Sequence, residues 1–175
     1  MGAGDMSAAG VAVVTFTAVG LGELHVSKDL GDELVCFGLG SCVAIAAFDP
    51  LVRVGGMAHL VLPDSTEGRL VNDEARFVDT GIPRLIDRLE VAGASRRRLN
   101  IKISGGAHVL AVAQGFEKRW NVGERNVEAA RAVLSGLRLP IVAEDVGGAR
   151  GRTVRLTLGT GVVSVSMIGA ETFEL

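Results

Sequence analysis

A cysteine and a histidine stand close together in a stretch of the chain that is rich in glycine. The segment GLGSCVAIAAF carries Cys42 directly after a glycine-rich turn, and the segment VGGMAHLVLPD carries His59 further along. A thiol beside an imidazole can act as a nucleophile, because the imidazole takes the thiol proton and favours the thiolate. The backbone N–H groups around Gly40, Ser41 and Cys42 also suit an oxyanion hole for acyl transfer.

The segment between these two residues predicts a hairpin that would bring them together. Asp49 and Pro50 suit the first two positions of a type I turn, because proline presets the backbone angle there. If residues 49–52 form the turn, Cys42 lies directly opposite His59, with Cβ atoms about 4.5–5.5 Å apart on one face. A shift of one residue would put the two side chains on opposite faces, so the pairing depends on the turn.

Other interpretations of Cys42 stay open from the residues alone. A single cysteine in an apolar run is most often a small buried hydrophobic residue. Zinc binding is disfavoured, because Cys36, Cys42 and His59 lack paired short spacings such as C-x-x-C. The glycine-rich turn matches no phosphate-binding motif. We therefore expect no metal and no cofactor.

The composition indicates one α/β domain. The chain has 175 residues, of which 48% are hydrophobic, with 24 glycines and a net charge of −2. This length suits a single domain, and the charge does not predict nucleic-acid binding. Two cysteines and an N-terminus without a signal peptide predict a reduced, cytoplasmic protein with no membrane insertion. We expect a disordered tail over residues 1–10 and one domain over residues 11–175.

Short β-branched runs predict most of the secondary structure as strands. The predicted strands cover residues 11–16, 33–37, 42–48, 54–62, 100–104, 141–145, 153–158 and 162–168. The last two flank a GTG turn and predict a hairpin. Many of these runs are apolar on both faces, which indicates buried sheets. The expected fold class is α/β, with sheets packed together and covered by helices.

Two segments have the spacing of amphipathic helices, over about residues 79–92 and 123–134. Asp79 or Thr80 is expected to cap the first helix, and Gly93 to end it. Gly136 is expected to close the second helix. Asn121 and Asn126, near the start of the second helix, are also expected to act as caps.

Several motifs in this order resemble the chemoreceptor glutamine deamidase family, CheD. The segments GLGSCVAI, AHLVLPDS, SGGA, NVGERNVEAA and AEDVGGARGRTV follow one another, and the resemblance runs from about Val19 to the C-terminus. It implies a layered fold similar to CheD and to deamidating toxins of the cytotoxic necrotizing factor type. It also implies that Cys42 is the nucleophile and His59 the general base.

The resemblance further implies a function in chemotaxis. Family members are cytoplasmic proteins that convert glutamines on chemoreceptor cytoplasmic domains to glutamate and release ammonia. Some also remove receptor methyl esters. Many bind CheC, a phosphatase that acts on the phosphorylated response regulator CheY. The expected partners are therefore chemoreceptors and a CheC-like phosphatase.

One position departs from the family pattern. Where the family usually has a threonine as the third catalytic member, six residues before the nucleophile, this chain has Cys36. Because a thiol is a weak hydrogen-bond partner, we expect His59 to be less well held, or oriented by a backbone carbonyl instead. A second hypothesis follows, in which the chain is a weakly active or inactive module that docks on a CheC-like phosphatase. A general cysteine peptidase is a third hypothesis.

Two further segments have open roles. Ser104, Gly105 and Gly106 follow a predicted strand, so they are expected either to line the substrate cleft or to form a tight turn at the strand end. The polar, glycine-rich segment AEDVGGARGR is expected to be either a docking surface or a simple connection.

Overall fold

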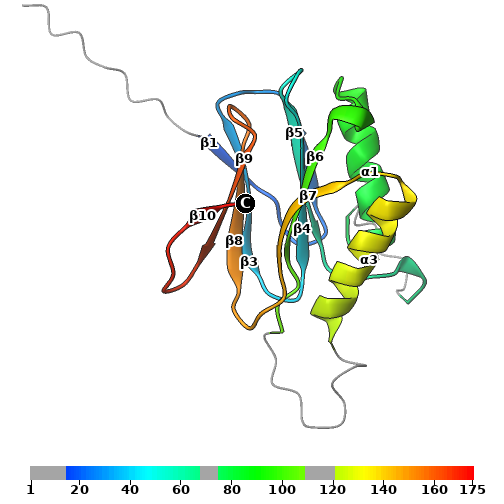
Figure 1. Ribbon diagram of the computed structural model, residues 1–175, viewed down its shortest axis with the longest axis vertical. Coiled ribbons are helices and arrows are strands. Elements are labelled where there is room, and N and C mark those ends of the chain that lie inside the picture. Colours follow the sequence, from blue (N-terminus) through cyan, green and yellow to red (C-terminus); the bar gives the residue numbers. More distant parts are fainter. Residues whose placement is uncertain (1–14, 68–74, 109–120) are drawn as a thin grey trace, which may run out of the picture.

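The computed structural model describes residues 15–67, 75–108 and 121–175 (Figure 1). The strands are β1 (Thr15–Ala18), β2 (Leu24–Ser27), β3 (Asp32–Leu39), β4 (Val43–Asp49), β5 (Val54–Leu60), β6 (Asn100–Gly105), β7 (Ile141–Val146), β8 (Arg152–Thr157), β9 (Val162–Met167) and β10 (Phe173–Glu174). The helices are α1 (Val78–Val91) and α3 (Val122–Gly136), with short 3-10 turns at Ser65–Glu67 and Arg96–Arg98. The predicted tail over residues 1–10 lies outside the described residues.

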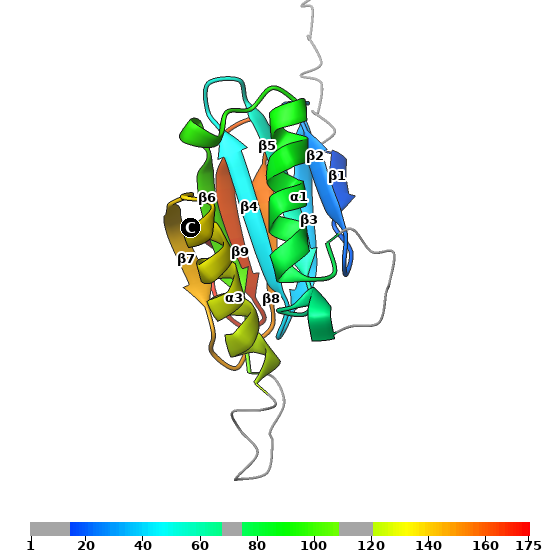
Figure 2. The same ribbon diagram turned by 90° about the vertical axis from the view of Figure 1, so that its right-hand side faces the viewer.

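Two five-stranded sheets pack face to face, and α1 and α3 cover the free face of one of them (Figures 1 and 2). The sheet without helices has the order β1-β3-β8-β9-β10, and the helix-covered sheet has the order β2-β5-β4-β6-β7. The pairs β1–β3 and β6–β7 are parallel, and the other pairs are antiparallel. The α/β class with packed sheets covered by helices is confirmed, as is the β8–β9 hairpin. The sequence prediction missed β2 and β10.

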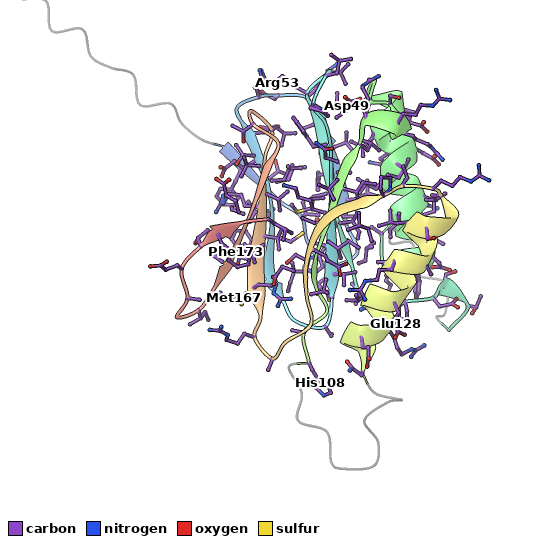
Figure 3. All side chains as sticks on the ribbon, viewed as in Figure 1. Asp49, Arg53, His108, Glu128, Met167 and Phe173 are labelled. Atoms are coloured by element: carbon purple, nitrogen blue, oxygen red, sulfur yellow. The ribbon has the colours of Figure 1, made fainter. Side chains whose placement is uncertain are left out.

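Two apolar layers hold these elements together. One lies between the helices and the helix-covered sheet, and the other lies between the two sheets. Strand β4 is buried along its whole length because it contributes to both layers: Val43 and Ile45 face the helices, whereas Ala44 and Ala46 face the other sheet. Side chains fill the space between the ribbons (Figure 3). Neither described helix is long and apolar enough to cross a membrane.

The start of α1 differs from the prediction. Its N-cap position is Phe77, which makes no side-chain capping bond. The Asp79 carboxylate instead accepts hydrogen bonds from the Ser65 N–H and hydroxyl, at 3.1 and 2.6 Å. The Thr80 hydroxyl donates to the Phe77 carbonyl at 3.5 Å and so is not a cap either. The predicted end is confirmed, since Gly93 follows the C-cap with a φ of 106°.

The predicted cap at the start of α3 is confirmed, but the predicted end differs from the structure. Asn121 is the N-cap, and its side-chain oxygen accepts from the Glu124 N–H at 3.1 Å. Gly136 is the last helical residue, but the left-handed residue that turns the chain is Arg138, with a φ of 58°. Asn126 is not a cap, because it lies inside the helix and is fully buried.

Candidate active site

The start of β4, the end of β5 and the end of β6 meet at one edge of the helix-covered sheet. Val43, the first residue of β4, pairs with both Leu60 and Gly105. Cys42 directly precedes β4, and His59 is the second-last residue of β5. The topology therefore brings the two candidate catalytic residues to the same end of the molecule.

Cys42 and His59 do not lie directly opposite each other, so that part of the sequence prediction is wrong. His59 pairs with Ala44, two residues beyond Cys42. Cys42 nevertheless faces the same layer, because a shift of two residues keeps a side chain on its face of the sheet. Its side chain packs against the layer between the sheets. The two residues are diagonal neighbours, for which the separation is about 7–8 Å.

The longer turn between β4 and β5 explains this difference. Asp49 pairs with Val54 rather than with residue 52, so the connection is two residues longer than the predicted turn. Arg53 closes it with a φ of 54°, and its N–H donates to the Asp49 carbonyl at 2.8 Å. Asp49 and Arg53 lie at one end of the molecule, and His108 lies at the other (Figure 3). A turn at the far end thus sets the register of the candidate site.

His59 is held by a backbone carbonyl, which is one of the two arrangements expected when Cys36 replaces the family threonine. The ring is 3% exposed, and its Nδ1 lies 3.1 Å from the Val19 carbonyl oxygen. Because a carbonyl only accepts, Nδ1 carries the proton and Nε2 has a free lone pair. Nε2 has no hydrogen-bond partner in the described part of the chain. Burial lowers the pKa of His59 below its usual value of 6.5. The Val19 bond and the Glu23 charge raise this pKa, but their effect is smaller than that of burial.

The Cys42 thiol is half-buried, and burial raises its pKa above the ordinary value. Its own backbone N–H acts in the opposite direction but does not outweigh burial. The raised pKa does not favour a resting thiolate, and an effect of the His59 imidazole on the thiol stays a prediction. Burial shifts the pKa values of Cys42 and His59 in the directions that favour a neutral thiol and a neutral imidazole, which is the combination that general-base catalysis requires.

The backbone of Gly40, Ser41 and Cys42, here named the nucleophile turn after the role predicted for Cys42, is fixed through its carbonyl groups. The Gly106 N–H donates to the Cys42 carbonyl and the Ala107 N–H to the Gly40 carbonyl, both at 2.7 Å. Within the described ranges, the N–H groups of Gly40, Ser41 and Cys42 donate to no other residue. The turn thus keeps its carbonyls paired and its N–H groups available.

Ser104, Gly105 and Gly106 are buried behind this turn. A Cβ at Gly105, whose φ is 120°, would overlap the Cys42 carbonyl oxygen and lie 3.0 Å from the Cα of Val43. The Ser104 hydroxyl donates to Asp145 at 3.4 Å. Gly106 lines a pocket of about 220 Å³ beside the start of α3. Their place in a substrate cleft stays a prediction.

Cys36 lies in β3, on the sheet opposite to His59, and faces the layer between the sheets. Its side chain is fully buried, and its Sγ donates to the Met57 Sδ at 3.3 Å. Burial, and then the neighbouring Cys42, raise the pKa of its thiol. Its part as third catalytic member stays a prediction.

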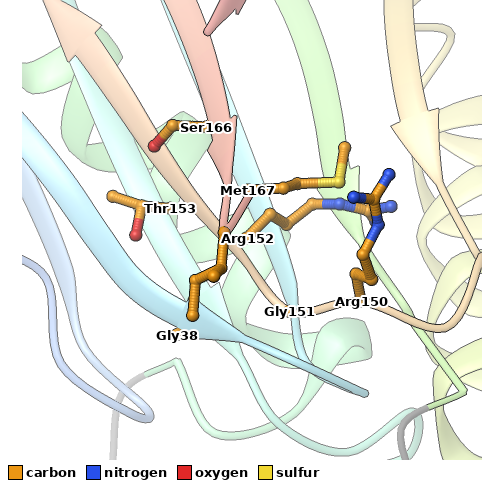
Figure 4. Close-up of a pocket in the computed structure, with 8 residues that line it drawn as sticks. Gly38, Arg150, Gly151, Arg152, Thr153, Ser166 and Met167 are labelled. Carbon is orange, nitrogen blue, oxygen red and sulfur yellow. The ribbon is translucent and has the colours of Figure 1, made fainter. Parts of the chain in front are cut away.

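A pocket of about 450 Å³ lies in the sheet without helices, where β3, the start of β8 and the end of β9 meet (Figure 4). It is lined by Gly38, by residues 150–153 and by residues 166–168, and contains neither candidate catalytic side chain. Arg152 is 5% exposed and donates to the carbonyls of Gly105 and Gly147, at 2.7 and 2.8 Å. Arg152, the last residue of the segment AEDVGGARGR, thus links the start of β8 to the strand end behind Cys42. A docking role for this segment stays a prediction.

Sequence reasoning missed the parts of Val19, Asn126 and Arg152 at this end of the molecule. Val19 is an ordinary apolar residue that acts through its carbonyl, so no side-chain pattern signals it. Asn126 and Arg152 did carry a signal: each is a polar residue within a motif that resembled the family.

The sequence of the chain is similar to those of a known protein family. The family model CheD, described as CheD chemotactic sensory transduction, matches residues 61–167. A protein of Symbiobacterium thermophilum, named probable chemoreceptor glutamine deamidase CheD, is 48% identical over 161 residues, covering 90% of this chain and 96% of that protein. Proteins with the same name from Clostridium tetani and Desulforamulus reducens are 40% and 38% identical, covering 90% and 87% of this chain and 94% and 90% of their own lengths.

Proposed function

The chain belongs to the CheD family, and we propose that it is a cytoplasmic chemotaxis enzyme that deamidates glutamines on chemoreceptor cytoplasmic domains. The relatives that span most of the chain carry the name probable chemoreceptor glutamine deamidase. The observation that carries the proposal is the unpartnered, buried Nε2 of His59 on the same face as the Cys42 thiol. The proposal extends to a fold similar to that of deamidating toxins of the cytotoxic necrotizing factor type.

The first half of the reaction forms a thioester. The Nε2 atom of His59 takes the proton of the Cys42 thiol, and the sulfur attacks the side-chain carbonyl carbon of a receptor glutamine. The C–N bond then breaks, and the protonated His59 gives its proton to the leaving ammonia. Because Val19 holds the Nδ1–H, the ring presents Nε2 for both proton transfers.

The oxyanion of the tetrahedral intermediate needs donors at the nucleophile turn. The N–H groups of Gly40, Ser41 and Cys42 are the donors we assign to it, since none of them donates to another described residue. Such preorganised donors stabilise the developing charge without reorganisation during the reaction.

The second half of the reaction hydrolyses the thioester. A water molecule that His59 deprotonates attacks the acyl carbon, and the Cys42 sulfur leaves to give glutamate. A glutamate methyl ester would enter the same cycle and release methanol in place of ammonia. The site is therefore proposed to carry a receptor methylesterase side activity, and the cycle uses no metal and no organic cofactor.

The test is ammonia release and intact mass with a purified chemoreceptor cytoplasmic fragment. The wild-type protein is expected to release ammonia and raise the receptor mass by about one dalton per site, because an amide becomes a carboxylic acid. Cys42→Ala should do neither, whereas Cys36→Ala, which removes the chain's other thiol, should keep measurable activity. Shortened receptor fragments would instead show a peptidase.

A second candidate function rests on Cys36. Its thiol contacts Met57 and replaces a family threonine, so His59 lacks a hydroxyl partner from this position. If the wild-type protein releases no ammonia from several receptors while Cys36→Thr does, the chain is a binding module that docks on a CheC-like phosphatase. Co-sedimentation with such a phosphatase would then measure the remaining function.

A further inference from the structure

Asn126 is a polar residue on the apolar face of α3. Its side chain is fully buried, in line with Gly123, Val127, Ala130 and Leu134 on the face that packs on the sheet. A buried amide is costly unless it is hydrogen-bonded. An apolar residue would suit this position on the buried face of α3, so a role for the amide has to be found in its hydrogen bonds.

The amide of Asn126 bonds to both segments of the candidate site. Its Nδ2 donates to the Ser41 carbonyl at 2.9 Å and to the Val61 carbonyl at 3.0 Å. Ser41 directly precedes Cys42, and Val61 follows His59 by two residues. One side chain therefore links the turn that carries the nucleophile to the strand that carries the base.

These two carbonyls lie where the backbone pairing stops. The last paired residues of β4 and β5 at this end are Val43 and Leu60. Beyond them, the Val61 N–H bonds to the Arg76 carbonyl instead of to the nucleophile turn. The Asn126 amide thus replaces the missing backbone bonds between the two segments.

We propose that Asn126 is a positioning residue that fixes the Cys42 turn relative to His59 through its two N–H groups. This inference rests on the proposed function, since it assigns Asn126 a part in that same site. The donors carry the contact, because both acceptors are carbonyls and the Oδ1 has no partner in the described ranges. Aspartate has the same shape but lacks these donors, so Asn126→Asp removes the contact without opening a cavity.

The control is the other asparagine of this helix. Asn121 caps α3 by bonding to Glu124 and contacts neither Ser41 nor Val61. Asn121→Ala therefore weakens the same helix without removing a hydrogen bond to Ser41 or Val61. Comparison of the two asparagines separates a loss of positioning from a loss of helix stability.

The first measurement is kcat and KM for ammonia release at 15 °C, per folded protein as judged by circular dichroism. Asn126→Asp and Asn126→Ala should lower kcat about 10- to 100-fold, because small misplacements of reacting groups are costly. The KM should stay within about threefold, since Asn126 is buried and does not reach the substrate. Asn121→Ala should keep kcat within about twofold. A folded Asn126→Asp protein with wild-type kcat overturns the proposal.

The second measurement needs no receptor and stays informative if the wild-type protein releases no ammonia. The rate of Cys42 alkylation by iodoacetamide is followed by peptide mass, which separates it from the fully buried Cys36. Asn126→Asp should change this rate more than threefold relative to Asn121→Ala, because the Ser41 carbonyl no longer holds the Cys42 backbone. Equal rates overturn the proposal, whether or not the deamidase function holds. If the aspartate variant does not fold, Asn126→Ala is judged by the same comparison.

Discussion

Substitution of Gly105 by alanine tests whether the strand end behind Cys42 must approach it closely. Gly105 has a φ of 120°, and a Cβ there would overlap the Cys42 carbonyl oxygen. The neighbouring Gly106 N–H also bonds to that carbonyl. The added methyl group must therefore displace the nucleophile turn or the end of β6.

The expected cost has two parts. A left-handed or extended positive φ costs about 1–3 kcal/mol for a residue with a Cβ. The overlap with backbone atoms adds about 1–3 kcal/mol, the usual range for overpacking a filled site. Together, Gly105→Ala should lose about 2–6 kcal/mol of unfolding free energy. A displacement of Cys42 by about 1 Å should also reduce kcat by about 100-fold.

Gly93 offers a matched control for the first part. Its φ is 106°, close to that of Gly105, but a Cβ there meets nothing within 4 Å. Gly93→Ala should therefore lose only the backbone strain, about 1–3 kcal/mol, and keep its activity. Urea unfolding gives the stability of both variants, and ammonia release gives their kcat. If the two variants lose equal stability and both keep wild-type kcat, the contact between Gly105 and Cys42 has no role and the reasoning is refuted.

Three further predictions concern ionisable groups. Alkylation of Cys42 should increase with pH through a pKa above its ordinary value, because burial raises that pKa; a rate already at its plateau at pH 7 would instead show a resting thiolate. Burial lowers the pKa of His59 in the folded protein, so on acidification the unfolded chain binds the imidazole proton before the folded chain does. The contribution of His59 to the unfolding free energy should therefore be complete above about pH 6.5 and fall as the pH drops below it. Urea unfolding of His59→Gln should show a smaller fall with decreasing pH, and an equal fall would contradict this. Burial opposes the ionised form of Asp49, but bonds from Arg98 and two backbone N–H groups lower its pKa to about 2. Asp49→Asn should therefore cost about 1–3 kcal/mol at pH 7. It should leave kcat unchanged, because asparagine keeps an Oδ1 that can accept from the Leu51 N–H in the turn that sets the register; lost activity at full stability would count against this.

The sequence determined the elements of this protein, because local patterns encode them. The β-branched runs predicted most strands, and the spacing of apolar residues predicted α1 and α3 to within about two residues at each end. The two-residue period of a strand also put Cys42 and His59 on the same face. That prediction survived a wrong register, because the error was two residues and not one.

Only the tertiary structure decided which atoms hold the site. The register between β4 and β5 depends on the left-handed Arg53 in a turn longer than the predicted one. The partner of His59 is the carbonyl of Val19, and that of the Cys42 turn is the amide of Asn126, both distant in sequence. A backbone carbonyl leaves no trace in residue type, and an asparagine near a helix start predicts a cap equally well. Such contacts arise from packing two sheets and a helix together, which no local pattern describes.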